Sequence, residues 1–185
     1  MARIPYAHLD GTIPKDNPFV GRKGARPEIY SYGHRNPQGI YYSRKLKKLF
    51  NSEHGPRGGD EINEVKAGGN YGWPVITYGR EYYGPKIGEG VRRDGMEQPL
   101  KYYVPSIAPS SLIIYESPKI KSLSGQFILG ALVLEHVNVV SPDGKNESRY
   151  LKSLAKRIRQ VRETPAGALL IGTDSGEIYR LAPVP

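Results

Sequence analysis

The sequence predicts an all-β protein built from short antiparallel strands. Runs rich in valine, isoleucine and tyrosine recur about every ten residues, and turn residues separate them. Glycine (22) and proline (16) make up about a fifth of the 185 residues, which favours short elements joined by many turns. Tyrosine (14) far outnumbers phenylalanine (3), and tyrosine suits half-exposed sheet surfaces. Because no convincing helical pattern interrupts the strands, a sandwich, a barrel or a propeller is expected.

The first half of the chain is expected to alternate short strands with long loops. Residues 1–27 are rich in Pro, Gly, Asp and Asn, and they predict a loop or a final strand that leads into a long connection. The segment EIYSYGHRNPQGIYYS (28–43) has two aromatic and β-branched runs around a turn, which indicates a hairpin. DEINEVKAGGNYGWP (60–74) predicts a short strand that a Gly-Gly-Asn turn ends. Residues 78–105 are rich in loop-forming residues.

The second half carries clearer strands. SLIIYE (111–116) predicts one strand, and residues 125–144 predict two strands followed by a type I turn at SPDG. IRQVRET, ALLIGTD and SGEIYRL (158–181) predict three more strands with glycine-containing turns between them. The chain ends as a finished domain would, on IYRLAPVP, and begins abruptly, so we expect the C-terminal portion of a larger protein.

The composition excludes several classes of protein. Without cysteine the chain has no disulfide, thiolate metal site or cysteine nucleophile. It has no run of about 18 apolar residues, so no membrane span is predicted, and its N-terminus lacks the apolar core of a signal peptide, so the localisation stays open. The net charge of +9 is spread along the chain without the interleaved aromatic and basic residues of a stacking platform. A basic solvated surface with some anion-binding arginines is favoured over nucleic-acid binding.

The stretch GHRNPQG (33–39) is the first candidate for chemistry. Pro37 fixes one backbone angle and holds the preceding residue extended. Arg35, Asn36 and Gln38 then offer several hydrogen-bond donors in a small space. The alternative is a turn whose side chains only cap backbone groups. A later loop with exposed hydroxyl groups, PSIAPSS, contains Ser106 and by itself predicts only a turn.

The stretch EHGPRGGDEIN (53–63) is a candidate calcium loop. Gly55 and Pro56 can present backbone carbonyls at a tight bend, and Asp60 and Glu61 supply carboxylate oxygens. Oxygen ligands of this kind suit Ca²⁺ better than zinc or copper. The alternative is an ordinary surface loop, because Gly-Pro and Asp-Glu pairs are common there.

The tripeptide RIR (157–159) is a candidate anion clamp. If it lies in a strand, Arg157 and Arg159 project from one face about 6.5 Å apart. Two guanidinium groups at that spacing can hold a polyanionic ligand. The alternative is the solvated polar face of an outer strand.

Taken in order, these stretches resemble one family, the soluble PQQ-dependent aldose and glucose dehydrogenases of the glucose/sorbosone dehydrogenase group. The resemblance covers about residues 8–183 and implies a partial six-bladed β-propeller with about three blades of four-stranded antiparallel sheet. Residues 1–185 would be its C-terminal portion, and residues 1–27 a loop connecting it to a missing N-terminal half. The matching motifs are YGHRNPQG, EHGPRGGDEIN, GGNYGWP, PSIAPSS, RIRQVR and GTDSGEIYRL.

The resemblance implies pyrroloquinoline quinone (PQQ) and Ca²⁺ as cofactors, and oxidation of an aldose at C1 to the lactone. PQQ carries three carboxylates and an ortho-quinone, so arginine forks would neutralise it and Ca²⁺ would polarise its quinone oxygen. An arginine donor such as Arg35 would stabilise the developing oxyanion. The resemblance implies that Arg35, Asn36 and Gln38 line the quinone and its calcium, and that the carbonyls of Gly55 and Pro56 bind that calcium. It implies that Glu61 and the backbone of Tyr71 bind a second, structural calcium. Ser106 would lie near the cofactor, and Arg157 and Arg159 would bind its carboxylates.

The chain also departs from the family pattern. Val133 stands where many relatives carry a lysine, a loss that His136 could offset, and the family's general-base histidine lies in the earlier half. None of His8, His34, His54 and His136 matches that base, and His34 is expected to lie nearest the cofactor. The alternative function is a non-catalytic propeller fragment that binds a ligand or a protein. Self-association through exposed blade edges is expected, the electron acceptor stays open, and full-length relatives are typically periplasmic or secreted.

Overall fold

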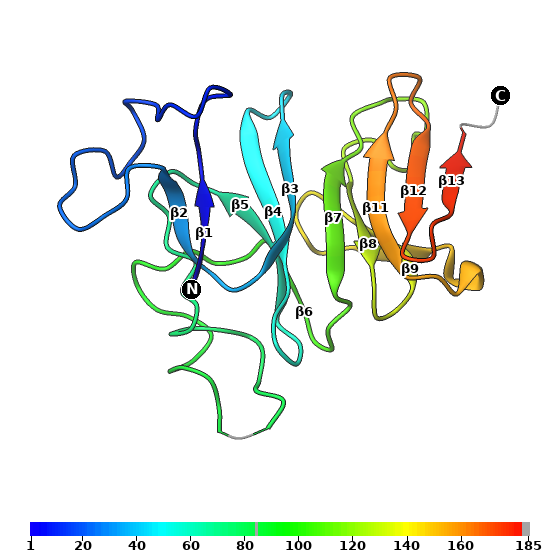
Figure 1. Ribbon diagram of the computed structural model, residues 1–185. Coiled ribbons are helices and arrows are strands. Elements are labelled where there is room, and N and C mark those ends of the chain that lie inside the picture. The colour runs from blue at the N-terminus through cyan, green and yellow to red at the C-terminus, as the bar shows by residue number, and fades with distance from the viewer. Residues whose placement is uncertain (84, 183–185) are drawn as a thin grey trace.

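The computed structural model describes residues 1–83 and 85–182 and confirms an all-β fold. Thirteen strands of these residues form four antiparallel sheets, arranged side by side like blades (Figure 1). The helical structure in this part of the chain is one short 3-10 turn at Lys152–Leu154. In the same residues no helix has the length and apolar character needed to cross a membrane.

Two complete four-stranded sheets lie between a two-stranded and a three-stranded one, which agrees with the expected three blades or so. Each four-stranded sheet is a simple meander, in which every strand pairs with the next along the chain. The sheets comprise β1 (Ala2–Pro5) and β2 (Ile29–His34); β3 (Pro37–Ser43), β4 (Lys48–Glu53), β5 (Asp60–Val65) and β6 (Lys101–Tyr103); β7 (Pro109–Ile114), β8 (Phe127–Ala131), β9 (His136–Val140) and β10 (Glu147–Tyr150); and β11 (Ile158–Glu163), β12 (Leu169–Thr173) and β13 (Ile178–Leu181).

The core lies between successive sheets. Strand β7 is buried on both faces: Leu112 packs in a cluster with Phe50 and Ile62 of the preceding sheet. Ile113 packs in a second cluster with Val161 and the rest of the β11–β13 sheet. Because side chains alternate between the faces of a strand, a strand that packs against neighbours on both faces needs apolar residues at successive positions, as in Leu112–Ile114. The two buried serines that precede this run bond the β11 backbone, Ser110 to the carbonyl of Ile158 and Ser111 from the N–H of Val161.

The predicted hairpin over residues 28–43 is wrong. Both of its strands form, but β2 pairs with β1, and β3 pairs with β4, so the chain passes from one blade to the next between them. The second edge of β2 is taken by the following turn, where the Tyr71 N–H donates to the carbonyl of Tyr32 at 2.8 Å. Of the two alternatives expected for residues 1–27, a loop or a final strand that leads into a long connection, the second agrees with the structure, because residues 2–5 form β1 and pair with β2.

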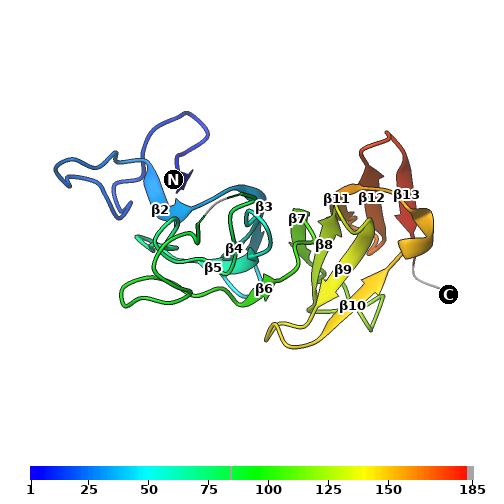
Figure 2. The same cartoon turned by 90° about the horizontal axis from the view of Figure 1, so that it is seen from below.

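All the candidate stretches lie at one end of the blades. Strands β3, β7 and β11 pack side by side and run in the same direction, upward in Figure 1. In an antiparallel meander, the segments that precede these strands lie at the same end as the β4–β5, β8–β9 and β12–β13 turns. This end, here called the site end, faces the viewer in Figure 2. It comprises residues 33–36, 54–59, 104–108, 132–135, 155–157 and 174–177.

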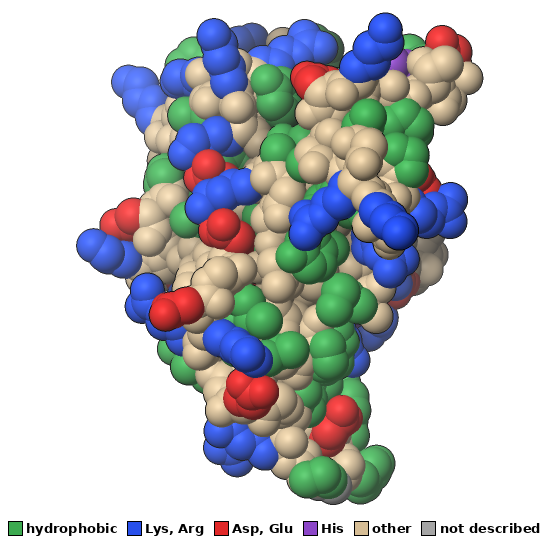
Figure 3. All heavy atoms as spheres, turned by 90° about the vertical axis from the view of Figure 1, so that its left-hand side faces the viewer, with side chains coloured by type: hydrophobic (Ala, Val, Ile, Leu, Met, Phe, Trp, Pro, Cys, Tyr) green, Lys and Arg blue, Asp and Glu red, His purple; other side chains and the backbone are tan. Residues whose placement is uncertain are grey.

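The β1–β2 side of the molecule leaves apolar surface open. A groove of about 840 Å³ runs between β1 and the β3–β4 hairpin, and Ile40 (53% exposed) and Tyr42 (55% exposed) line it. Figure 3 looks onto this side and shows apolar side chains among basic and acidic ones that are spread over the face. Self-association through such open surface stays a prediction.

Candidate functional site

The site end brings together arginines that are far apart in the sequence. The Arg35 guanidinium donates from Nη1 to the carbonyl of His54 at 3.0 Å and lies over the Trp73 ring, 5.4 Å from its centroid. Burial lowers the pKa of His54, and the positive charges of Arg35 and Arg159 act in the same direction. Arg35 lies just before β3, and Arg159 lies in β11, two blades further along the chain. Two separate blades therefore contribute cations to one region.

Glu53, which the sequence reasoning did not select, holds the HRNPQG turn. Its Oε2 accepts the backbone N–H of Arg35 at 2.8 Å, and its Oε1 lies 3.1 Å from Nδ1 of His34. The His34 ring is fully buried, stacks on Tyr71 with ring centroids 4.3 Å apart, and bonds Ser31 through Nε2. The His34 ring therefore points into the blade, and its expected place near the cofactor stays a prediction. His54, also at the site end, is only partly buried.

Asn36 and Gln38 are exposed on the outer side of the same turn. The amide nitrogen of Gln38 donates to the amide oxygen of Asn36 at 2.9 Å, so the two side chains hold each other in place. The remaining polar atoms of both amides face solvent and are available to a ligand.

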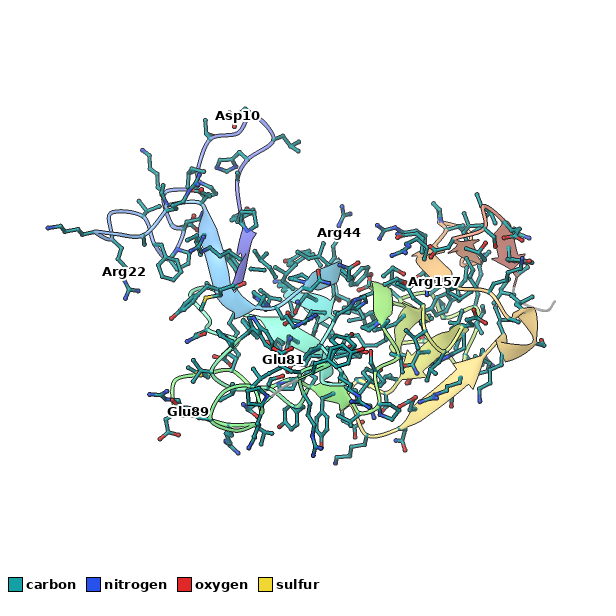
Figure 4. The ribbon with its side chains drawn as sticks, turned by 60° about the horizontal axis from the view of Figure 1, so that its bottom comes forward. Asp10, Arg22, Arg44, Glu81, Glu89 and Arg157 are labelled. Atoms are coloured by element: carbon teal, nitrogen blue, oxygen red, sulfur yellow. The ribbon has the colours of Figure 1, made fainter. Side chains whose placement is uncertain are left out.

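Arg157 and Arg159 lie side by side, as the sequence predicts for RIR, and share Asp174. The Asp174 carboxylate accepts from Nε of Arg157 at 2.9 Å and from Nε of Arg159 at 2.6 Å, and these bonds lower the pKa of that carboxyl. Nη2 of Arg157 and Nη1 of Arg159 have no protein partner among the described residues. Arg157 sits where the chain enters β11 (Figure 4), so the pair keeps a net positive charge and free donors at the site end.

The Gly55–Pro56 corner offers oxygen ligands. Both residues are buried, and no N–H in the described part of the chain donates to either carbonyl. Buried carbonyls ordinarily find a partner, so these two are suited to a bound cation. In residues 1–83 and 85–182 no three histidine, aspartate or glutamate side chains are placed so that they could hold a metal ion together, so carbonyl oxygens would have to supply much of such a cation site.

Ser106 does not present a free hydroxyl at the site end. Its Oγ donates to Oδ2 of Asp60 at 2.6 Å. The Asp60 carboxylate is fully buried and accepts three backbone N–H groups as well, so it does not join Glu61 in a second calcium site.

Glu61 and Tyr71 line a second small cavity, with room for about one water-sized sphere. Burial, followed by the neighbouring Glu53 carboxylate, raises the pKa of Glu61 to about 8, although a hydrogen bond from Asn63 opposes the shift. The buried amide oxygen of Asn63 has no partner among the described residues. The Glu61 carboxyl with its raised pKa, the Asn63 amide oxygen without a partner and the small cavity together fit a bound divalent cation.

Val133 lies at the site end, 58% exposed, and adds no cation there. His136 cannot offset this, because its ring is buried and bonds the carbonyl of Leu134, and burial lowers its pKa. The suggestion that His136 supplies the lost charge is therefore wrong.

Glu61→Gln is expected to stabilise the cation-free chain at alkaline pH. A carboxyl whose folded pKa is raised costs stability as the pH climbs from its unfolded pKa, about 4.3, to its folded value of about 8. The variant should be more stable than the wild type by on the order of 5 kcal/mol at pH 8.5 in a chelator, and equal to it near pH 4.5. Denaturant unfolding at the two pH values checks this.

Calcium should reduce this difference in stability between the two proteins. If Glu61 helps to bind the second ion, saturating Ca²⁺ at pH 8.5 will stabilise the wild type by more than it stabilises the variant, which keeps only the Gly55–Pro56 carbonyls. Equal calcium stabilisation of both proteins would show that Glu61 is not a ligand.

Comparisons with known proteins agree on one group. The family model described as glucose/sorbosone dehydrogenase matches residues 3–180. The aldose sugar dehydrogenase YliI of Escherichia coli K12 is 44% identical over 180 residues, which cover 94% of this chain and 48% of that protein.

Solved structures show the same relation. The apo crystal structure of the soluble aldose sugar dehydrogenase from Escherichia coli superposes with a TM-score of 0.89 at 43% identity, over 95% of this chain and 52% of that one. The PQQ-bound aldose sugar dehydrogenase from Streptomyces coelicolor superposes with a TM-score of 0.72 at 26% identity, over 97% and 50%. The present chain thus spans about half the length of the curated relatives it matches.

Proposed function

Because this chain belongs to the glucose/sorbosone dehydrogenase family, we propose that it binds PQQ with Ca²⁺ at the site end and serves the oxidation of an aldose at C1 to the lactone. The observation that carries the proposal is that Arg35 and Arg159, from two different blades, both act on His54, while Asp174 holds Arg157 next to Arg159. The PQQ-bound relative supports the choice of cofactor. Sugar oxidation is supported by the names of the relatives.

The residues present fit the two cofactors. Arg157 and Arg159 would bind carboxylates of PQQ through the donors that Asp174 leaves free, with Asp174 fixing both guanidinium planes. The carbonyls of Gly55 and Pro56 would hold Ca²⁺ next to the cofactor, and Glu61 a second ion. When bound, PQQ supplies a two-electron acceptor whose quinone oxygen the metal polarises. Arg35, fixed by the His54 carbonyl and by Glu53, would donate to the oxygen that gains charge.

The residue that would accept the proton of the sugar's C1 hydroxyl is the part of the reaction that this chain supports least. His34 and His136 are buried, and Nε2 of His54 donates to the carbonyl of Pro109 at 2.8 Å, which leaves only Nδ1 of His54 to accept a proton, on a ring whose pKa is lowered by burial. This observation favours a second candidate, a non-catalytic module that binds the cofactor or another anion without oxidising sugar.

One spectroscopic experiment separates the two functions. The chain is mixed with PQQ in calcium buffer, freed of unbound cofactor, and then given glucose or another aldose. Aldose oxidation predicts that the quinone absorption of the bound cofactor is lost as the sugar is added. Bound cofactor that keeps its quinone spectrum would favour the binding module.

A further inference from the structure

Asp60 ties together two segments of the site end that belong to neighbouring blades. The carboxylate is fully buried at the first position of β5. Its Oδ1 accepts the backbone N–H of Gly55 at 2.9 Å, which fixes the Gly55–Pro56 corner. Its Oδ2 accepts the N–H groups of Ile107 at 2.8 Å and Ala108 at 2.9 Å. These two residues lie in the crossover that leads from β6 into β7.

The four donors leave Asp60 with little capacity for a ligand. The Ser106 hydroxyl takes a fourth position on the carboxylate at 2.6 Å. A carboxylate that accepts several backbone N–H groups is held in one orientation. The role of Asp60 is thus to hold the protein's own loops.

The backbone around the Gly55–Pro56 corner is packed too closely to admit a side chain at its glycines. A Cβ added at Gly55 would lie 2.0 Å from the Gly58 carbonyl oxygen, and one at Gly59 would lie 2.3 Å from the Gly79 nitrogen. The backbone of residues 55–59 therefore packs directly on itself and on the backbone of Tyr78 and Gly79. The Gly59 N–H also donates to the Tyr103 carbonyl at 2.7 Å, but the Asp60 carboxylate is the group that joins the Gly55 amide to the amides of Ile107 and Ala108.

We propose that Asp60 is a positioning residue for the calcium and PQQ site: it holds the Gly55–Pro56 carbonyls at a fixed place against the β6–β7 crossover before any ligand binds. The proposal rests on the proposed function of the site end. Ligand groups that are held in place beforehand lose less freedom on binding, so removing such a support weakens affinity by about 10- to 100-fold in metal sites.

Asp60→Asn is the primary test. Its side chain keeps the shape of Asp60 but replaces one acceptor oxygen by an NH₂ donor, which would face N–H or O–H groups. The bond from His54 to the Pro109 carbonyl still links the two segments, which favours a folded variant. We expect a PQQ dissociation constant in calcium buffer about tenfold or more above that of the wild type. We also expect faster hydrogen exchange at the amides of Gly55, Ile107 and Ala108 in the ligand-free chain.

Glu163→Gln is the matched control. Glu163 also accepts two backbone N–H groups, from Glu116 and Ser117 at 2.8 and 2.9 Å, but it does so at the opposite end of the blades. A purely structural loss should therefore act alike in both variants, whereas positioning predicts that Glu163→Gln keeps the wild-type affinity. Ser106→Ala, which removes one of the four donors and keeps Asp60, should weaken PQQ binding by a few fold and serves if Asp60→Asn does not fold.

The outcomes separate this proposal from the proposed function. Wild-type affinity in Asp60→Asn, or in Ser106→Ala if Asp60→Asn does not fold, would overturn the role of Asp60 while leaving the cofactor site in place. An equal loss of affinity in Glu163→Gln would overturn it as well. A folded wild-type chain that binds no PQQ would overturn the proposed function and this role with it.

Discussion

Gly39→Ala is expected to lower the melting temperature by roughly 6–12 °C, because a shift of 1 kcal/mol moves the melting temperature of a chain this size by roughly 2–4 °C. Gly39 lies on β3 where β3 packs against β7. A Cβ there would lie 2.6 Å from the Ser52 hydroxyl and 2.7 Å from the backbone nitrogen of Leu112. Backbone cannot move aside as a flexible side chain does, so the two sheets must separate at a cost of about 3 kcal/mol.

Gly172→Ala is the control for this substitution. Gly172 also lies in a strand, β12, but its Cβ would meet only the Cβ of Gln160 at 3.6 Å, which is ordinary contact. The control should melt within a few degrees of the wild type, since alanine also lowers the entropy of the unfolded chain. If both variants melt alike, close approach of β3 and β7 does not hold the blades together.

Replacing Arg157 and Arg159 together by alanine is expected to weaken PQQ binding about 100-fold or more. Hydrogen bonds to charged groups are each worth about 1.5–3 kcal/mol, and two such contacts are lost. The double variant also frees Asp174, whose negative charge would then repel the carboxylates of the cofactor. Calorimetric titration in calcium buffer measures the loss directly.

Arg162→Ala controls for the loss of positive charge in general. Arg162 is an exposed residue of the same strand, β11, and pairs across it with Leu170, away from the site end. The variant should bind PQQ as the wild type does. An equal loss in this variant would mean that net charge rather than the clamp attracts the cofactor.

The strands that sequence patterns predicted best are those whose environment is simplest. Strand β7 is buried on both faces, and the apolar run that it contains therefore predicted a strand. Strands β6 and β10 were not predicted, because they are short and mostly exposed and carry no apolar pattern. Strand β4 was missed as well, because its buried residues are mostly polar, with Phe50 followed by Asn51, Ser52 and Glu53. The pairing of β2 with β1 could not be predicted from local sequence. The two strands on either side of Arg35 have the pattern of a hairpin, but each of them pairs in a different sheet.

The candidate site divides in the same way. The spacing in RIR predicts neighbouring guanidinium groups, and Arg157 and Arg159 do converge on Asp174. Glu53 was not selected and Asp60 was predicted to be a metal ligand, because their hydrogen-bond partners lie 18 and 46 residues away. A buried carboxylate next to a glycine-rich bend was the available signal: each acid had to find donors, and the bends offered free N–H groups.

The affinity of the wild-type chain for PQQ, measured by calorimetry in Ca²⁺ and again in a chelator, tests the central claim most directly. If the site end is a cofactor site, binding will be saturable at one PQQ per chain and much weaker when calcium is removed. A chain that melts cooperatively but shows no calcium-dependent binding would contradict the account, since Arg35, Arg157, Arg159 and the Gly55–Pro56 carbonyls would then be brought together without forming a site.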